Sequence, residues 1–277
     1  MRKRIRRRLF AGIIAAFLCA VTTTALAIEP IACLAEDSLP EAIYDARIII
    51  LGEIHGTEES PRFAAQLLCA LADNGRTVVL GLEILDWEQP TLDDYLQDLS
   101  REDFVPSADS IFWASPVLDG RSSKAMAELI SQVKAFRSLG MQIDIVAFDG
   151  AVQDDQNRDD VMASNIRKAI MEREGSQLLL LTGRVHAFQT LGAPFDAGFR
   201  SMANQLSEYS PLSLLMTHAG GTAWTCHGAE CSTFELEPDR SQFGDPNGRI
   251  VLQTVDDGRF DGYYVVDHIT ASPPAVR

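Results

Sequence analysis

The stretch Arg47-Ile-Ile-Ile-Leu-Gly-Glu-Ile-His-Gly-Thr57 decides the fold. Its first half, Ile48 to Leu51, is a short apolar run rich in β-branched residues, which is typical of a strand buried on both faces of a parallel sheet. An acid and an imidazole follow it, Glu53 and His55. A helix is expected next, with Ser60-Pro61 as its cap and first residue. Polar groups at the carboxyl end of a strand, before a helix, lie where open α/β sheets bind ligands.

Three further apolar segments have the same form, because each is short and leads into a titratable residue. They span residues 76–84, 142–148 and 178–181, and they lead to Glu83, Asp149 and His186. Helical patterns at 88–99, 122–139 and 158–174 lie between them. This alternation predicts an α/β fold, a mainly parallel sheet flanked by helices. Short strands between glycine-rich turns then predict a C-terminal β extension rather than a second domain, at 214–217, 223–226, 249–253 and 263–266.

Residues 1–27 are expected to be a signal peptide. Six basic residues precede the apolar run 9–20, and Ala25-Leu-Ala27 has the small-x-small form of a cleavage site. The run is too short to span a membrane comfortably, so we expect a periplasmic or secreted protein with one domain at 28–277. Losing six positive charges changes the formal net charge from −15 to −21. Such an acidic surface argues against nucleic acid or an anionic membrane as a partner.

The mature chain retains four cysteines, Cys33, Cys69, Cys226 and Cys231. An even count in an oxidising compartment predicts disulfides. We expect Cys226 and Cys231 to close a hairpin or loop, and Cys33 and Cys69 to tie the N-terminal arm to the first helix. The alternative is a metal site at Cys226, His227 and Cys231, although these residues lack the fourth ligand of a structural zinc site.

Four polar side chains, Glu53, His55, Glu83 and His186, are expected to share a pocket, because parallel strands bring their carboxyl ends to one edge of the sheet. Leaving so many polar groups unpaired at a buried edge would be costly. His55, Glu83 and His186 could hold a divalent metal that activates a water. The same groups could instead work without metal, with His55 as general base. Asp149 precedes a turn glycine and is expected to be a cap.

Two Gly-x-x-His motifs, Gly52-Glu-Ile-His55 and Gly183-Arg-Val-His186, bracket Glu83. With segments 53–96 and 158–166, they resemble the superfamily of ChaN-like haem-binding uptake proteins, Tiki/TraB proteins and erythromycin esterases. For Tiki-like members the resemblance implies a divalent metal on the two histidines and the glutamate, with peptide-bond hydrolysis. For esterase-like members it implies a histidine base with glutamate partners, acting on an ester or lactone. For ChaN-like members it implies haem binding without catalysis.

One residue departs from the resembled pattern. Relatives commonly have asparagine where this chain has Arg184. A guanidinium there would repel a cation and favour an anionic substrate group, and Arg121, before a helix N-terminus, is a second candidate for substrate contact. The sequence therefore predicts an exported hydrolase acting on a small-molecule or peptide substrate. The alternative is a haem- or iron-binding protein without turnover.

Overall fold

The computed structural model describes residues 29–115, 119–151, 155–227, 230–239 and 249–276. The expected signal peptide lies outside these residues. Among the described helices, none is long and apolar enough to cross a membrane.

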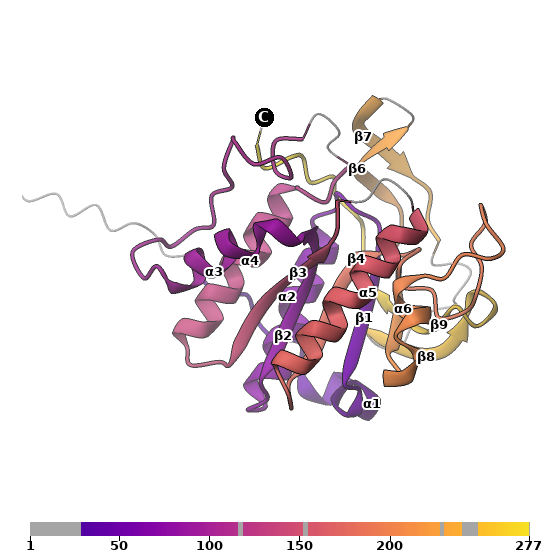
Figure 1. Cartoon of the computed structure of the whole chain (residues 1–277), viewed down its shortest axis with the longest axis horizontal. Coiled ribbons are helices and arrows are strands. Elements are labelled where there is room, and N and C mark those ends of the chain that lie inside the picture. The colour runs from indigo at the N-terminus through magenta and orange to yellow at the C-terminus, as the bar shows by residue number, and fades with distance from the viewer. Residues whose placement is uncertain (1–28, 116–118, 152–154, 228–229, 240–248, 277) are drawn as a thin grey trace, which may run out of the picture.

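A seven-stranded sheet lies at the centre of the molecule, with strand order β3-β2-β4-β1-β5-β9-β8 (Figure 1). The first six of these strands are parallel to their neighbours, and β8 is antiparallel to β9. The strands of the sheet are β1 (Ile48–Glu53), β2 (Val78–Leu85), β3 (Ile143–Asp149), β4 (Gln177–Gly183), β5 (Leu212–Thr217), β8 (Ile250–Val255) and β9 (Phe260–Val265). The expected class, a mainly parallel α/β sheet with a C-terminal β extension, is confirmed.

Helices cover both faces of the sheet. They are α1 (Glu41–Asp45), α2 (Glu59–Asp73), α3 (Gln89–Gln97), α4 (Lys124–Ser138), α5 (Asp155–Glu172) and α6 (Met202–Gln205). Ile49 and Leu51 of β1 pack in the core beneath α2 and α4, whereas Ile48 and Ile50 pack in the core beneath α5 and α6. Because successive strand side chains point to opposite faces, both cores need apolar residues. This explains the uninterrupted apolar run.

Two helix starts test the expected capping residues. The hydroxyl of Ser123 accepts a hydrogen bond from the Met126 N–H and caps α4 at the start of the expected helical pattern 122–139. By contrast, α2 begins at Glu59, so Ser60 lies inside its first turn and is not the cap. The Ser60 hydroxyl instead lies 2.7 Å from the Tyr264 hydroxyl of β9. Pro61 is tolerated there because N–H groups of a first turn have no partner within the helix.

A two-stranded hairpin, β6 (Gly221–His227) and β7 (Glu230–Leu236), lies outside the sheet at the end where the parallel strands finish (Figure 1). The Trp224 N–H donates to the Gly56 carbonyl at 2.9 Å, which docks the hairpin on the loop after β1. Gly56 has a φ of 72°, and a Cβ there would lie 2.0 Å from the Trp224 oxygen. The close approach therefore requires glycine. Strand β7 was not predicted, because its half-exposed residues lack an apolar pattern.

Both expected disulfides are present, Cys33–Cys69 and Cys226–Cys231. The first joins the N-terminal arm to α2, and the second joins the facing residues of β6 and β7. The prediction of an alternative metal site at Cys226, His227 and Cys231 is wrong, because the sulfurs of Cys226 and Cys231 are bonded to each other. The His227 ring stacks on the Phe234 ring, with 3.9 Å between centroids.

Side chains occupy part of the free edge of the outer strand β3. The Gln89 Nε2 donates to the Ile145 carbonyl at 3.0 Å, and its Oε1 accepts from the Ala147 N–H at 2.7 Å. Arg137 Nη1 donates to the Ile143 carbonyl at 2.6 Å. The amide of Gln89 thus makes two hydrogen bonds that a neighbouring strand would otherwise make.

Candidate functional site

Glu83, at the carboxyl end of β2, is the centre of the site. Its Oε2 accepts hydrogen bonds from Thr182 Oγ1 at 2.6 Å and from the Gly183 N–H at 2.7 Å. Its Oε1 lies 3.5 Å from His55 Nε2 and 3.8 Å from His186 Nε2. Both imidazoles therefore face one carboxylate oxygen, and their Nε2 atoms are no farther apart than the sum of these distances.

Glu53 and His55 form a hydrogen-bonded pair beside Glu83. His55 Nδ1 lies 2.9 Å from Glu53 Oε1, while Glu53 Oε2 is buried and has no hydrogen-bond partner among the described residues. Burial disfavours a charged imidazole, but the carboxylates of Glu83 and Glu53 outweigh it and raise the pKa of His55 to about 10. Burial also favours a neutral Glu83, yet the positive charges of His55 and Arg158 hold the pKa of Glu83 well below its usual value. At neutral pH His55 is therefore an imidazolium, and it lies between the carboxylates of Glu53 and Glu83.

The second imidazole, His186, is held between an acid and a guanidinium. Its Nδ1 lies 2.8 Å from Asp159 Oδ2, and its Nε2 lies 3.1 Å from Arg158 Nη1. A guanidinium can only donate, so Nε2 accepts and Nδ1 carries the proton. Asp159 is fully buried, and its other oxygen accepts from the Met202 N–H at 2.5 Å. These contacts fix one tautomer and one ring orientation.

Two arginines join the carboxylates. Arg158 binds Asp149 in bidentate fashion, through Nε to Oδ1 and Nη2 to Oδ2, each at 2.8 Å, and Nη2 also donates to Glu83. Arg121 Nη1 donates to Asp149 at 2.5 Å, and its Nε donates to Asp119 at 2.9 Å. Burial lowers the pKa of both guanidiniums, but the surrounding carboxylates, Glu83 first, raise it above its usual value. The prediction that Asp149 is a cap was wrong, because it anchors both arginines.

The expected site residues thus fall into two groups. Glu53, His55, Glu83 and His186 come together, and Arg121 lies beside them in ion pairs. Arg184 is exposed, and its side chain makes no hydrogen bond or ion pair with another described residue. Its N–H donates to the Glu53 carbonyl at 3.1 Å. Arg184 lines a cavity of about 240 Å³ next to the site, together with Glu53, Asp239 and Asp256.

Sequence reasoning missed two residues of the site, Arg158 and Asp159. They lie in the first turns of α5 rather than at a strand end, so strand-end logic could not find them. The available signal was their adjacent position in the segment of α5 that resembles the superfamily.

The donors of the site do not suit a divalent metal. The lone pair of His186 Nε2 accepts from Arg158, and the two guanidiniums of Arg121 and Arg158 face Glu83 Oε1. In the part of the chain that the structure describes, no group of three or more His, Cys, Asp or Glu side chains has the geometry to hold a metal.

The same residues do not suit haem in this arrangement. An axial ligand needs a nitrogen or oxygen free to reach the iron from an apolar slot. The ring nitrogens of His55 and His186 face charged groups, and the Tyr264 hydroxyl is fully buried against Ser60. The cavity beside Glu53 is small and lined by carboxylates.

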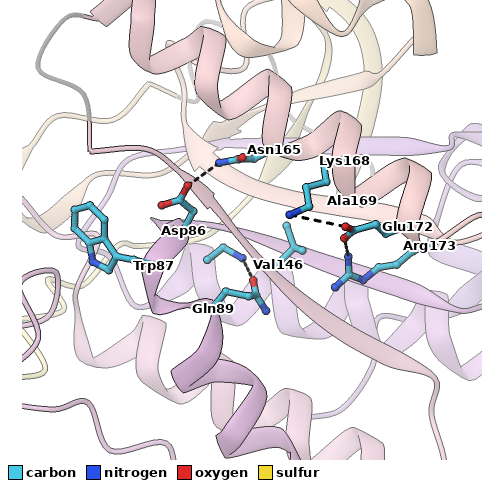
Figure 2. A pocket seen from close by; sticks show the side chains of 10 residues that line it. Asp86, Trp87, Gln89, Val146, Asn165, Lys168, Ala169, Glu172 and Arg173 are labelled. Carbon is cyan, nitrogen blue, oxygen red and sulfur yellow. Dashed lines mark hydrogen bonds and ion pairs between the residues drawn. The ribbon is translucent and has the colours of Figure 1, made fainter.

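Another cavity, of about 280 Å³, lies on the outer side of β3 between α5 and the 3₁₀ helix Asp86–Glu88 (Figure 2). Its polar groups pair with one another: Asn165 with Asp86 at 3.4 Å, and Lys168 with Glu172 at 3.8 Å. Neither imidazole of the site lines this cavity. It is therefore separate from the cluster around Glu83.

Comparisons with known proteins agree with the expected superfamily. The sequence model described as haem-binding uptake, Tiki superfamily, ChaN matches residues 39–117, which include Glu53, His55 and Glu83. An erythromycin esterase variant, with asparagine in place of a histidine and in its open conformation, has a similar structure: 12% identity, 85% of this chain and 94% of that chain covered, and a TM-score of 0.60. No curated protein sequence matches the chain.

Two other solved structures have the same fold. A succinoglycan biosynthesis protein is 9% identical, with 84% of this chain and 90% of that chain covered and a TM-score of 0.60. A Bacillus cereus protein is 10% identical, with 88% and 96% covered and a TM-score of 0.57. Likeness at such low identity shows the fold alone. The match over residues 39–117 confirms the resemblance to the superfamily.

Proposed function

We propose that this chain, whose residues 39–117 match the ChaN and Tiki superfamily and whose fold is that of an erythromycin esterase, is an exported hydrolase. It activates water against an ester or related acyl bond. The observation that carries this proposal is the convergence of His55, His186 and Glu53 on Glu83 at the carboxyl edge of the sheet.

The carboxylates of this cluster are buried, whereas its imidazoles and guanidiniums are partly exposed. The side chains of Glu53 and Glu83 are each 2% exposed, whereas those of His55 and His186 are 20% and 12% exposed. The arginines are similarly accessible, at 22% for Arg121 and 20% for Arg158. A substrate would therefore contact nitrogen atoms of the histidines and arginines, and the carboxylates would lie behind these side chains.

The protonation of His55 determines the roles we assign. An imidazolium with a pKa of about 10 cannot take a proton from water at neutral pH, but it can donate one. We assign the role of proton acceptor to Glu53, since its Oε2 has no partner among the described residues. This oxygen is buried, so the water reaches it through the adjacent cavity that Glu53 lines. This differs from the base role that the resemblance implied for His55.

A water oxygen bonds to the acyl carbon while its proton passes to Glu53. The bond from the acyl carbon to the leaving oxygen breaks, and that oxygen takes the proton of His55 Nε2. His55 keeps its Nδ1 proton, which faces Glu53 at 2.9 Å, so Nε2 takes up a proton from solvent and Glu53 releases its proton to solvent, which restores both groups. Arg121 and Arg158 provide fixed positive charge for the negative oxygen that develops at the acyl carbon.

The test uses the mature protein and a panel of chromogenic esters and lactones. His55→Gln and Glu53→Gln are each expected to lower kcat by about 100-fold or more, the usual contribution of a general acid or base. His268→Gln is the matched control, since His268 is exposed. As pH rises through about 10, kcat should fall because His55 loses its proton. Unchanged hydrolysis in both site variants would contradict the proposal.

Export is part of the same proposal. Two disulfides fit an oxidising compartment, and the basic and apolar N-terminal pattern motivates cleavage near residue 28. Intact mass spectrometry of the exported protein should show the loss of about 27 residues. A retained N-terminus would contradict it.

Haem binding is the second candidate, favoured by the description of the matched family. Haem titration of the mature protein would give a Soret band with a defined stoichiometry if this candidate were correct. The charged surroundings of both imidazoles predict no such band.

A further inference from the structure

Arg158 is surrounded by side chains of the types that bind divalent metals in proteins. Its guanidinium contacts both oxygens of Asp149, Oε1 of Glu83 and Nε2 of His186. Two carboxylates and an imidazole are donors that Zn²⁺ and Mn²⁺ use in proteins. His55 Nε2 faces the same Glu83 oxygen from the other side at 3.5 Å.

We infer that the guanidinium of Arg158 takes the place of a divalent cation in this site, so that the native protein excludes metal there. Only the catalytic consequence of this inference rests on the proposed hydrolase. Whether metal or arginine occupies the site does not depend on the proposed hydrolase, and it is measured without turnover.

The contacts of Arg158 leave no room for a metal to share the site. Metal binding needs the Nε2 lone pair of His186, which accepts from Arg158. It also needs Asp149, which is fully buried and holds both Arg158 and Arg121. An added cation would face two guanidiniums near Glu83, since Arg121 Nη1 lies only 3.7 Å from Glu83 Oε1.

A guanidinium offers properties that a bound ion lacks. Arginine keeps its charge at every pH the protein meets, and it cannot be removed by a chelator because it is part of the chain. Its planar fork holds Asp149 bidentately while it orients Glu83 and His186. Arg158 is therefore a positioning residue that also supplies a permanent positive charge.

The inference predicts a latent metal site. Truncating Arg158 to alanine leaves Asp149, Glu83 and His186 without the guanidinium that contacts all three, while Arg121 still pairs with Asp149. As they stand among the described residues, these three side chains do not have the geometry of a metal site, so binding requires them to close into the space that Arg158 leaves, with water completing the shell. Arg158→Ala should therefore bind metal where the native protein does not.

The experiment titrates Zn²⁺, and separately Mn²⁺, into the mature protein by calorimetry, with metal analysis after dialysis. The native protein and Arg158→Lys, which keeps a cation, should retain no stoichiometric metal. Arg158→Ala should bind one equivalent of Zn²⁺, and its melting temperature should rise with added Zn²⁺. Arg173→Ala is the matched control, because Arg173 pairs with Asp144 at 2.9 Å and is similarly exposed, yet its loss should create no site.

Two results would overturn the inference: one equivalent of Zn²⁺ on the native protein that His186→Ala abolishes, or a folded Arg158→Ala that binds no more Zn²⁺ than Arg158→Lys. Should Arg158→Ala fail to fold alone, refolding with Zn²⁺ is expected to restore it, and failure of that rescue also counts against the inference. Metal binding by Arg158→Ala in a protein without ester hydrolysis would support the inference while removing the proposed function.

Discussion

Replacing Glu83 with glutamine tests the electrostatics of the whole site. Glutamine keeps a carbonyl oxygen for Thr182 and Gly183, but it removes the charge and directs N–H groups at the donors of Arg158 and His55. Removing one partner of a buried ion pair costs about 3–5 kcal/mol of unfolding free energy. Because Arg158 keeps its bidentate contact with Asp149, we expect the lower end, about 3 kcal/mol.

Two measurements check this prediction. Denaturant unfolding gives the free energy directly, and the melting temperature should fall by about 6–12 °C, given about 2–4 °C per kcal/mol for a chain of this size. Imidazole titration by NMR reports His55. Its pKa of about 10 should fall toward the ordinary value, since Glu83 makes the largest contribution to raising it.

The matched control is Glu88→Gln. Glu88 is also buried, but its carboxylate accepts from the Ser110 hydroxyl at 2.6 Å and makes no ion pair with a described residue. A glutamine oxygen can replace that acceptor, so its cost should be about 1 kcal/mol or less. Equal stability losses in the two variants, or an unchanged His55 pKa in Glu83→Gln, would refute this account of the site.

Three further outcomes are expected. Because the pKa of His55 is raised from 6.5 to about 10, its stabilisation is complete below pH 6.5 and is lost as pH rises through 10; unfolding measured across this window should flatten in His55→Gln. Asp159→Asn should lower kcat more than it changes KM, because His186 loses its fixed tautomer; an effect on KM alone would oppose this. Removing Cys33–Cys69 should cost about 4 kcal/mol and Cys226–Cys231 about 2 kcal/mol, from loop lengths in the chain-entropy model, as unfolding of each double Cys→Ser variant can show.

The strand-end logic found the part of the site that depends on β1, β2 and β4. Side chains there have positions fixed by the carboxyl edge of a parallel sheet, so Glu53, Glu83 and His186 were predictable from apolar runs alone. Asp149 was misjudged, because a turn glycine after it also fits a local cap. Its true partners, Arg121 and Arg158, lie in a loop and a helix whose placement depends on tertiary packing.

The starts of two helices show the same difference between residues with local partners and residues whose partners are distant in sequence. The cap of α4 at Ser123 follows from local chemistry, and it was predictable. The start of α2 was not, because the Ser60 hydroxyl pairs with Tyr264, which is distant in sequence. Polar residues therefore mislead sequence interpretation when their partner comes from another element.

The amide of Gln89 occupies hydrogen-bonding groups of β3, the strand at one edge of the sheet. A parallel sheet presents a row of open peptide groups along its last strand, and another chain can pair with them. At the β3 edge, one side chain imitates the neighbour that is missing, and Arg137 covers a further carbonyl. Leucine at position 89 would uncover the Ile145 carbonyl and the Ala147 N–H beside the half-exposed Trp87. That change would leave peptide groups of β3 free to pair with a strand of another molecule, and the residues around Glu83 would be unaffected.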